Sequence, residues 1–139
     1  IMQVSRGHRK TDLFDDKEYP AAYPIPGGNT VCLPYLSALI RLSDEIDVAA
    51  DRNSQILYDI ENIRDEFQIY CNRLQEAVAC LHVNDESFVM DVKTQDEKIY
   101  RGLCEAQEKM QETLDLCRTV VHARTPYCIT QKCVEMRRI

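Results

Sequence analysis

The strongest pattern in the chain is a helical repeat of apolar positions between Tyr35 and Leu81. Steps of four and three residues alternate without a slip, which is the period of a coiled coil. No Gly or Pro interrupts the stretch, and its single clearly polar position is Asn53. The sequence therefore predicts a helix over residues 34–81, opened by Pro34. Its seam consists of Tyr35, Leu39, Leu42, Ile46, Ala49, Asn53, Ile56, Ile60, Ile63, Phe67, Tyr70, Leu74, Ala77 and Leu81.

A polar run at residues 51–54 leaves two architectures open for this helix. Its Asp, Arg, Asn and Ser residues favour turns and caps. One architecture is a continuous rod in which Asn53 is buried and sets the register of an oligomer. The other is a pair of helices folded back at this run. The heptad phase on both sides favours the rod, because a turn has no reason to preserve it.

The flanking segments predict an all-α fold with a proline-rich arm. The stretch YPAAYPIPGGN cannot hold a helix, so residues 1–33 are expected to form an extended or disordered arm. Thr94 and Glu97 have capping-box spacing and predict a helix over 95–123, after a loop that begins at His82. The tail allows a short helix over 128–137. Because the apolar face of helix 34–81 is wide, residues 34–139 are expected to form a helical bundle or hairpin.

Seven cysteines change this picture towards a covalently stapled protein. No C-x-x-C pair is present, and His122, Cys128 and Cys133 are poorly spaced for a metal, so disulfides are expected. Disulfides indicate an oxidising compartment, and therefore an extracellular, secreted protein. No signal-peptide pattern is present at the amino end.

Helix geometry suggests which cysteines pair. Antiparallel packing of the two long helices brings Cys71 opposite Cys104. Folding the tail back at Pro126 brings Cys117 opposite Cys133, with Cys128 as a close rival. The cysteines left unassigned or available for an intermolecular bridge are Cys32, Cys80 and Cys128. The odd count indicates a disulfide-linked dimer, and the alternative is a buried free thiol.

Charge and missing motifs exclude several function classes. The formal charge of −6 and the pI near 5.1 argue against nucleic acid or an anionic membrane as the main partner. No apolar run reaches the ~20 residues of a membrane span. The chain lacks G-x-S-x-G, H-E-x-x-H, a Gly-rich phosphate loop and an EF-hand loop. Cys80 and His82 are too close in sequence to face each other across a cleft. We therefore expect no enzyme, no cofactor and no metal.

One resemblance concerns roughly residues 67–133. The phrases FQIYCNRLQEAVACL and LCEAQEKMQETLDLC, with Cys71 and Cys80 followed by the row Cys104, Cys117 and Cys128, resemble the cysteine-rich helical domains of unknown function in secreted nematode proteins. The resemblance implies a helical fold and an extracellular location. It implies no function.

These observations predict a secreted, non-enzymatic module for protein–protein recognition or assembly. A long helix with a wide apolar face and an unpaired cysteine favours self-association as a homo-oligomer, alongside an unknown protein partner. The alternative is an extracellular carrier of a small apolar ligand. Its cavity within the bundle would be lined by soft or aromatic residues, namely Phe67, Tyr70, Phe88, Met90 and Met110.

Overall fold

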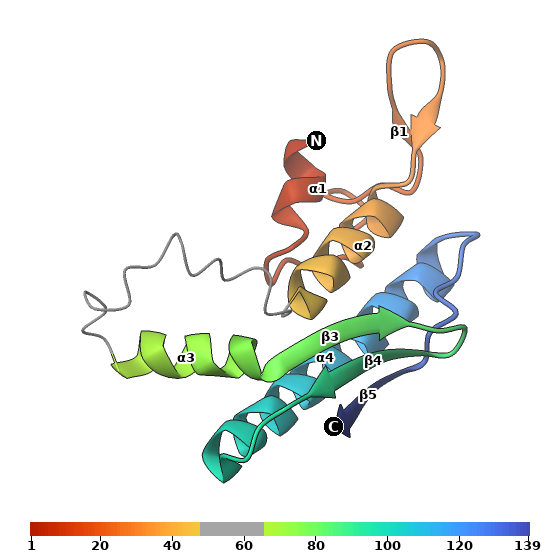
Figure 1. Cartoon of the computed structure of the whole chain (residues 1–139). Helices are drawn as coiled ribbons and strands as arrows, with labels where there is room; N and C mark the ends of the chain where they lie inside the picture. The colour runs from red at the N-terminus through yellow and green to blue at the C-terminus, as the bar shows by residue number, and fades with distance from the viewer. Residues whose placement is uncertain (48–65) are drawn as a thin grey trace. The chain divides into compact units, whose positions relative to one another are not determined.

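The computed structural model describes residues 1–47 and 66–139 and shows a mixed α/β protein (Figure 1). The chain divides into two compact units. Unit 1 comprises Ile1–Ile46 with Glu112–Lys132, and unit 2 comprises the described part of Asp47–Gln111 with Cys133–Ile139. In chain order the elements are α1 (Met2–Arg6), β1 (Tyr23–Pro24), β2 (Thr30–Val31), α2 (Leu33–Ile46), α3 (Glu66–Ala77), β3 (Val78–Val83), β4 (Ser87–Val92), α4 (Glu97–Arg124) and β5 (Cys133–Arg138).

Two arginines fasten the amino-terminal segment of unit 1. Arg41 of α2 is buried, and its guanidinium donates to the carbonyl oxygens of Gly7 at 2.7 Å and Thr11 at 2.8 Å. Arg124 of α4 donates to the carbonyl oxygen of Tyr19 at 2.8 Å, and Tyr19 is fully buried. Hydrogen bonds from a charged donor are among the stronger ones in proteins. The segment expected to be an extended arm is therefore anchored within the unit.

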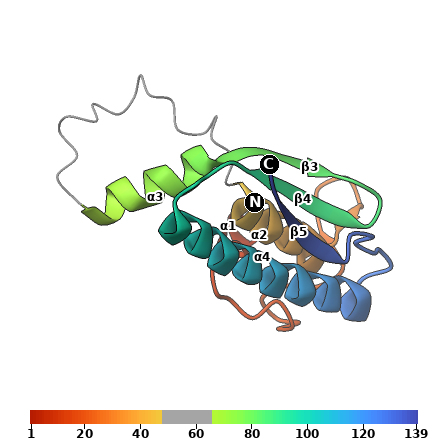
Figure 2. The same cartoon turned by 60° about the horizontal axis from the view of Figure 1, so that its bottom comes forward.

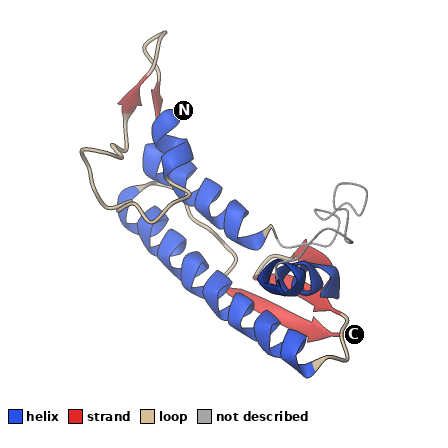
Figure 3. Cartoon of the chain, turned by 90° about the vertical axis from the view of Figure 1, so that its left-hand side faces the viewer, coloured by secondary structure: helices blue, strands red, loops and turns tan. Residues whose placement is uncertain are grey.

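Unit 2 contains a three-stranded sheet with β4 in the middle (Figure 2). β4 pairs antiparallel with β3 and parallel with β5. Alternation along β4 directs Phe88, Met90 and Val92 to one face, where all three are buried. Leu103 and Met110, from the first half of α4, are buried as well. The apolar core of the unit therefore lies between one sheet face and this half of the helix (Figure 3).

The carboxy-terminal strand is held in place by side chains of α4. Gln107 Nε2 donates to the carbonyl oxygen of Val134 at 2.7 Å. Gln111 Oε1 accepts the backbone N–H of Val134, also at 2.7 Å. Val134 itself is buried. Both backbone groups of Val134 that face away from β4 are therefore satisfied by the helix, which sets the position of β5.

The structure corrects the all-α prediction. α2 and α3 occupy the two ends of the predicted helix 34–81, but α3 ends at Ala77 and the last seam residue, Leu81, lies in β3. Residues 51–54, including Asn53, lie outside the described residues. The expected loop after His82 contains β4, and the expected tail helix contains β5.

The physical reason is a hairpin signal in residues 78–92. Two runs rich in Val and other strand formers flank a turn in which Asn84 Oδ1 accepts the backbone N–H of Glu86 at 2.9 Å and of Ser87 at 2.7 Å. β4 pairs with a strand along each of its edges. The helical phase at residues 77–81, by contrast, rests on only two apolar positions, Ala77 and Leu81. At α4 the cap also differs from the prediction, because Asp96 Oδ1 accepts the N–H of Lys98 at 2.8 Å.

The predicted disulfide staples are wrong. All seven cysteines lie in the described part of the chain and are free thiols, so neither Cys71 with Cys104 nor Cys117 with Cys133 is bridged. The predicted pairs assumed that two long helices, joined by a loop, pack antiparallel. The β3–β4 hairpin lies between α3 and α4 instead. Cys117 packs as a buried thiol and donates to the carbonyl oxygen of Ala38 at 3.3 Å.

The extracellular location and the intermolecular roles of Cys32, Cys80 and Cys128 stay predictions. No helix within residues 1–47 or 66–139 is long and apolar enough to cross a membrane.

The thiols provide a first test. We expect the denatured protein, without reductant, to react with seven equivalents of a thiol reagent. In the native protein Cys117 should react last, because burial raises its thiol pKa to about 11 and keeps reagent away. Exposed Cys128 is the matched fast-reacting control, read by mass spectrometry of labelled peptides. Fewer than seven reactive thiols would indicate that a disulfide is present.

Gly102 of α4 provides a test of the packing in unit 2. A Cβ at this position would lie 2.1 Å from the hydroxyl oxygen of Tyr70 and 2.8 Å from Cδ2 of Leu74. Gly102→Ala should therefore lower the free energy of unfolding by about 1–3 kcal/mol, in spite of the better helix propensity of Ala. Urea denaturation measures the change.

Two further variants complete this test. Tyr70→Phe in the Gly102→Ala background should recover part of the loss, because it removes the nearest atom. Glu108→Ala, at an exposed position of the same helix, should leave stability within about 0.5 kcal/mol. Equal stability of Gly102→Ala and the parent chain would contradict the close packing of α3 on α4.

Candidate metal centre

A β-bulge in β3 brings a cysteine, a histidine and an aspartate together on one face of the sheet in unit 2. Val78 pairs with Val92, but Cys80 pairs with Asp91, so two steps along β3 oppose one step along β4. Such a bulge changes the face to which the following side chains point. Val78 is buried, whereas Cys80 and His82 are exposed. The bulge therefore places Cys80 and His82 on the same face as Asp91, away from the core.

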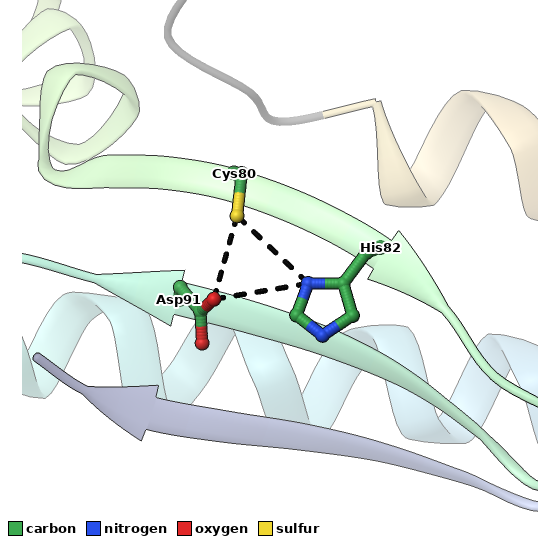
Figure 4. A group of neighbouring side chains, drawn as sticks. All are labelled: Cys80, His82 and Asp91. Atoms are coloured by element: carbon green, nitrogen blue, oxygen red, sulfur yellow. Dashed lines mark hydrogen bonds and ion pairs between the residues drawn. The ribbon is translucent and has the colours of Figure 1, made fainter.

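Three different donor atoms converge on this face (Figure 4). Cys80 Sγ lies 3.4 Å from Asp91 Oδ2 and 3.8 Å from His82 Nδ1. His82 Nδ1 lies 3.7 Å from Asp91 Oδ2. Within the described residues, this is the group of three or more Cys, His and acidic side chains whose donor atoms could share one metal ion. The cluster is built on a hydrogen-bonded hairpin rather than on a loop.

Arg137 of β5 borders the cluster. The parallel register aligns it with Asp91, and its Nε lies 2.9 Å from Asp91 Oδ1. Its Nη2 lies 3.2 Å from Asp91 Oδ2 and 3.1 Å from His82 Nε2. Because a guanidinium can only donate, His82 Nε2 must accept in this arrangement, which leaves the ring proton on Nδ1.

The electrostatics of the cluster follow from these contacts. The hydrogen bond from Arg137 holds the pKa of Asp91 below its usual value, so Asp91 is an anion at neutral pH. The hydrogen bond to the Asp91 carboxylate raises the pKa of the Cys80 thiol. Cys80 therefore keeps its proton in the metal-free protein and donates it to Asp91.

This geometry does not suit nucleophilic catalysis by Cys80. A nucleophilic cysteine needs a lowered pKa and a histidine that takes its proton through one nitrogen while an acid orients the other. Here Cys80 and Asp91 both face Nδ1 of His82, and Nε2 faces Arg137. The thiol pKa is raised instead.

The same geometry suits a tetrahedral metal ion. Zn²⁺ with bonds of about 2.3 Å to sulfur and about 2.0–2.1 Å to nitrogen and oxygen places the sulfur about 3.5 Å from each lighter donor, and the nitrogen and oxygen about 3.3 Å apart. The observed separations are 3.4, 3.8 and 3.7 Å. Small side-chain rotations bring all three donors to bonding distance of one ion.

From the sequence we expect no metal, and this cluster is not predicted. The residues considered as metal ligands, His122, Cys128 and Cys133, do not come together in the described residues. From the sequence, Cys80 has no assigned partner, and neither His82 nor Asp91 is predicted to bind a metal. The signal was present: Cys-x-His on one strand, an Asn-Asp turn, and an Asp on the partner strand at a facing position. This pattern is not recognised as a hairpin when residues 78–81 are assigned to a helix.

The cavities of the structure do not coincide with the ligand site predicted from the sequence. Met90 and Met110 line a cavity of only about 190 Å³ in unit 2, and Phe67 is 70% exposed. A larger apolar pocket of about 630 Å³ lies in unit 1, between α1, the β1–β2 hairpin and α2. The pocket in unit 1 contains none of the residues predicted to line a ligand site, and an apolar-ligand carrier stays a prediction.

Comparison with known proteins identifies a family. A family model described as HD-CE matches residues 1–123, which is most of the chain. The chain belongs to the HD-CE family. The matched span of this HD-CE chain includes Cys80, His82 and Asp91, whereas β5 and Arg137 follow it. Neither the curated proteins nor the solved structures gave a significant match. Nothing in these comparisons bears on the nematode domains, so that resemblance stays a prediction.

Proposed function

We propose that this HD-CE protein binds a metal ion of the zinc class through Cys80, His82 and Asp91. The observation that carries the proposal is the convergence of the three donor atoms within 4.8 Å of one another. Thiolate and imidazole ligands suit Zn²⁺ and its analogue Co²⁺, whereas Mg²⁺ and Ca²⁺ favour all-oxygen sites. Three protein ligands leave the fourth tetrahedral position open.

An open position at an exposed site gives the metal a use in recognition. Cys80 and His82 lie at the surface, so a donor group of another molecule can reach the ion. A metal centre of this kind is consistent with our expectation of a non-enzymatic recognition or assembly module, which remains a proposal. The metal would supply binding energy for association that the free cysteines do not provide as disulfides.

Metal binding is the direct test. The full-length protein should bind one Co²⁺ per chain and show a thiolate-to-cobalt charge-transfer band. Cys80→Ser should remove the band, and His82→Ala or Asp91→Asn should weaken binding by at least about 100-fold, because even second-shell changes cost 10–100-fold. Cys128→Ser, at an exposed cysteine outside the cluster, is the matched control. Absence of the band, or a band that survives Cys80→Ser, would refute the proposal.

Arg137 provides a second test, because it competes with the metal. Its Nη2 shares Asp91 Oδ2 with the ion, and a metal on His82 Nδ1 leaves a proton on Nε2 that faces Nη2. Arg137→Ala should therefore bind Zn²⁺ about 3–10-fold more tightly, the value of one ordinary hydrogen bond. Competition against a chromogenic chelator measures the change.

Arg138 offers the matched control for this substitution. Its guanidinium pairs with Glu97 at 3.1 Å and lies over the ring of Tyr100, outside the cluster. Arg138→Ala should leave the zinc affinity unchanged. Weaker binding by Arg137→Ala would show that orientation of Asp91 outweighs competition.

A further inference from the structure

We infer that the metal centre, once occupied, binds a carboxylate group of a partner molecule between the ion and Arg137. This inference rests on the proposed function and names the chemical class of its ligand. It follows from the charge of the cluster, from the hydrogen-bond donors that the metal releases and from the shape of the guanidinium group.

The charge of the occupied site favours a monoanion. A divalent ion is neutralised by the Cys80 thiolate and the Asp91 carboxylate, and His82 is neutral as a ligand. The ion, its three ligands and Arg137 together then carry a net charge of about +1. A single carboxylate cancels this charge, and with Glu135 on the same face a dianion would make the site clearly negative.

The metal also releases a donor. In the metal-free structure Arg137 Nη2 contacts Asp91 Oδ2 at 3.2 Å and His82 Nε2 at 3.1 Å. A metal on His82 Nδ1 leaves the proton of the neutral ring on Nε2, which then cannot accept from Nη2, and the same metal uses one of the lone pairs of Asp91 Oδ2. The contact of Arg137 Nε with Asp91 Oδ1, at 2.9 Å, is unaffected and keeps the guanidinium beside the ion. Its Nη2 then requires a new acceptor next to the open position.

A carboxylate matches this pair of partners better than other anions do. One oxygen can bind the metal while the other accepts from Nη2, in the planar geometry that a guanidinium offers. Glu135 lies two residues before Arg137 on β5 and therefore on the same face of the sheet. Its negative charge disfavours phosphate dianions more than a carboxylate monoanion. The chemical group that fits this position is therefore a carboxylate.

The experiment uses full-length protein saturated with Co²⁺ and titrated with acetate, the smallest carboxylate probe. Acetate should displace water from the ion and shift the visible spectrum of Co²⁺. The acetate affinity should fall about tenfold or more in Arg137→Ala. It should fall less in Arg137→Lys, which keeps the positive charge but loses the planar arrangement of N–H donors. Arg138→Ala should respond like the parent protein. Phosphate at the same pH should bind more weakly than acetate.

The outcomes separate the two proposals. Loss of the Co²⁺ band in the parent protein would overturn the metal centre itself, and this inference with it. A normal band with no acetate response, or with the same response in Arg137→Ala, would overturn the carboxylate site and leave the metal centre intact. Tighter binding of phosphate than of acetate would overturn the selection of a monoanion.

Discussion

The pairing of β4 along both of its edges is the interaction on which the candidate site depends. β3 on one edge carries Cys80 and His82, β5 on the other carries Arg137, and β4 itself supplies Asp91. The apolar side chains of β4 are buried, so the strand has one register in which its core face stays out of water. A slip of one residue would turn Asp91 into the core. Burial of Phe88, Met90 and Val92 therefore sets the face on which Asp91 lies.

Within that frame, the bulge and the carboxy-terminal strand have separate roles. The bulge after Val78 directs Cys80 and His82 outward, so one strand contributes to the core at its start and to the cluster afterwards. β5 is held by Gln107 and Gln111, and it brings a cation against the carboxylate. Arg137 stabilises Asp91 as an anion, and its Nη2 lies beside both Asp91 and His82.

Unit 1 is held together by arginine hydrogen bonds and not by the disulfides that the sequence predicts. In place of covalent bridges, Arg41 and Arg124 donate to backbone carbonyls of the amino-terminal segment. Breaking such a buried contact by removing one partner leaves carbonyl groups unsatisfied and costs about 1–3 kcal/mol each. Free thiols are compatible with this design: Cys117 fills a buried position as a small apolar residue.

Elements whose signals lie within a few residues could be predicted from the amino-acid sequence. Pro34 marked the start of α2, and the apolar period with Pro126 located α4 to within two residues at its start and one at its end. Local signals also explain the errors, because the seam at Ala77 and Leu81 is compatible with a helix until the pairing of residues 78–83 is considered. That these residues form a strand, and that no cysteines pair, follows from the three-dimensional fold. The same fold brings Cys80, His82, Asp91 and Arg137 together. The physical reason is that strand pairing joins residues up to 46 positions apart, and its energy appears only when the whole sheet forms.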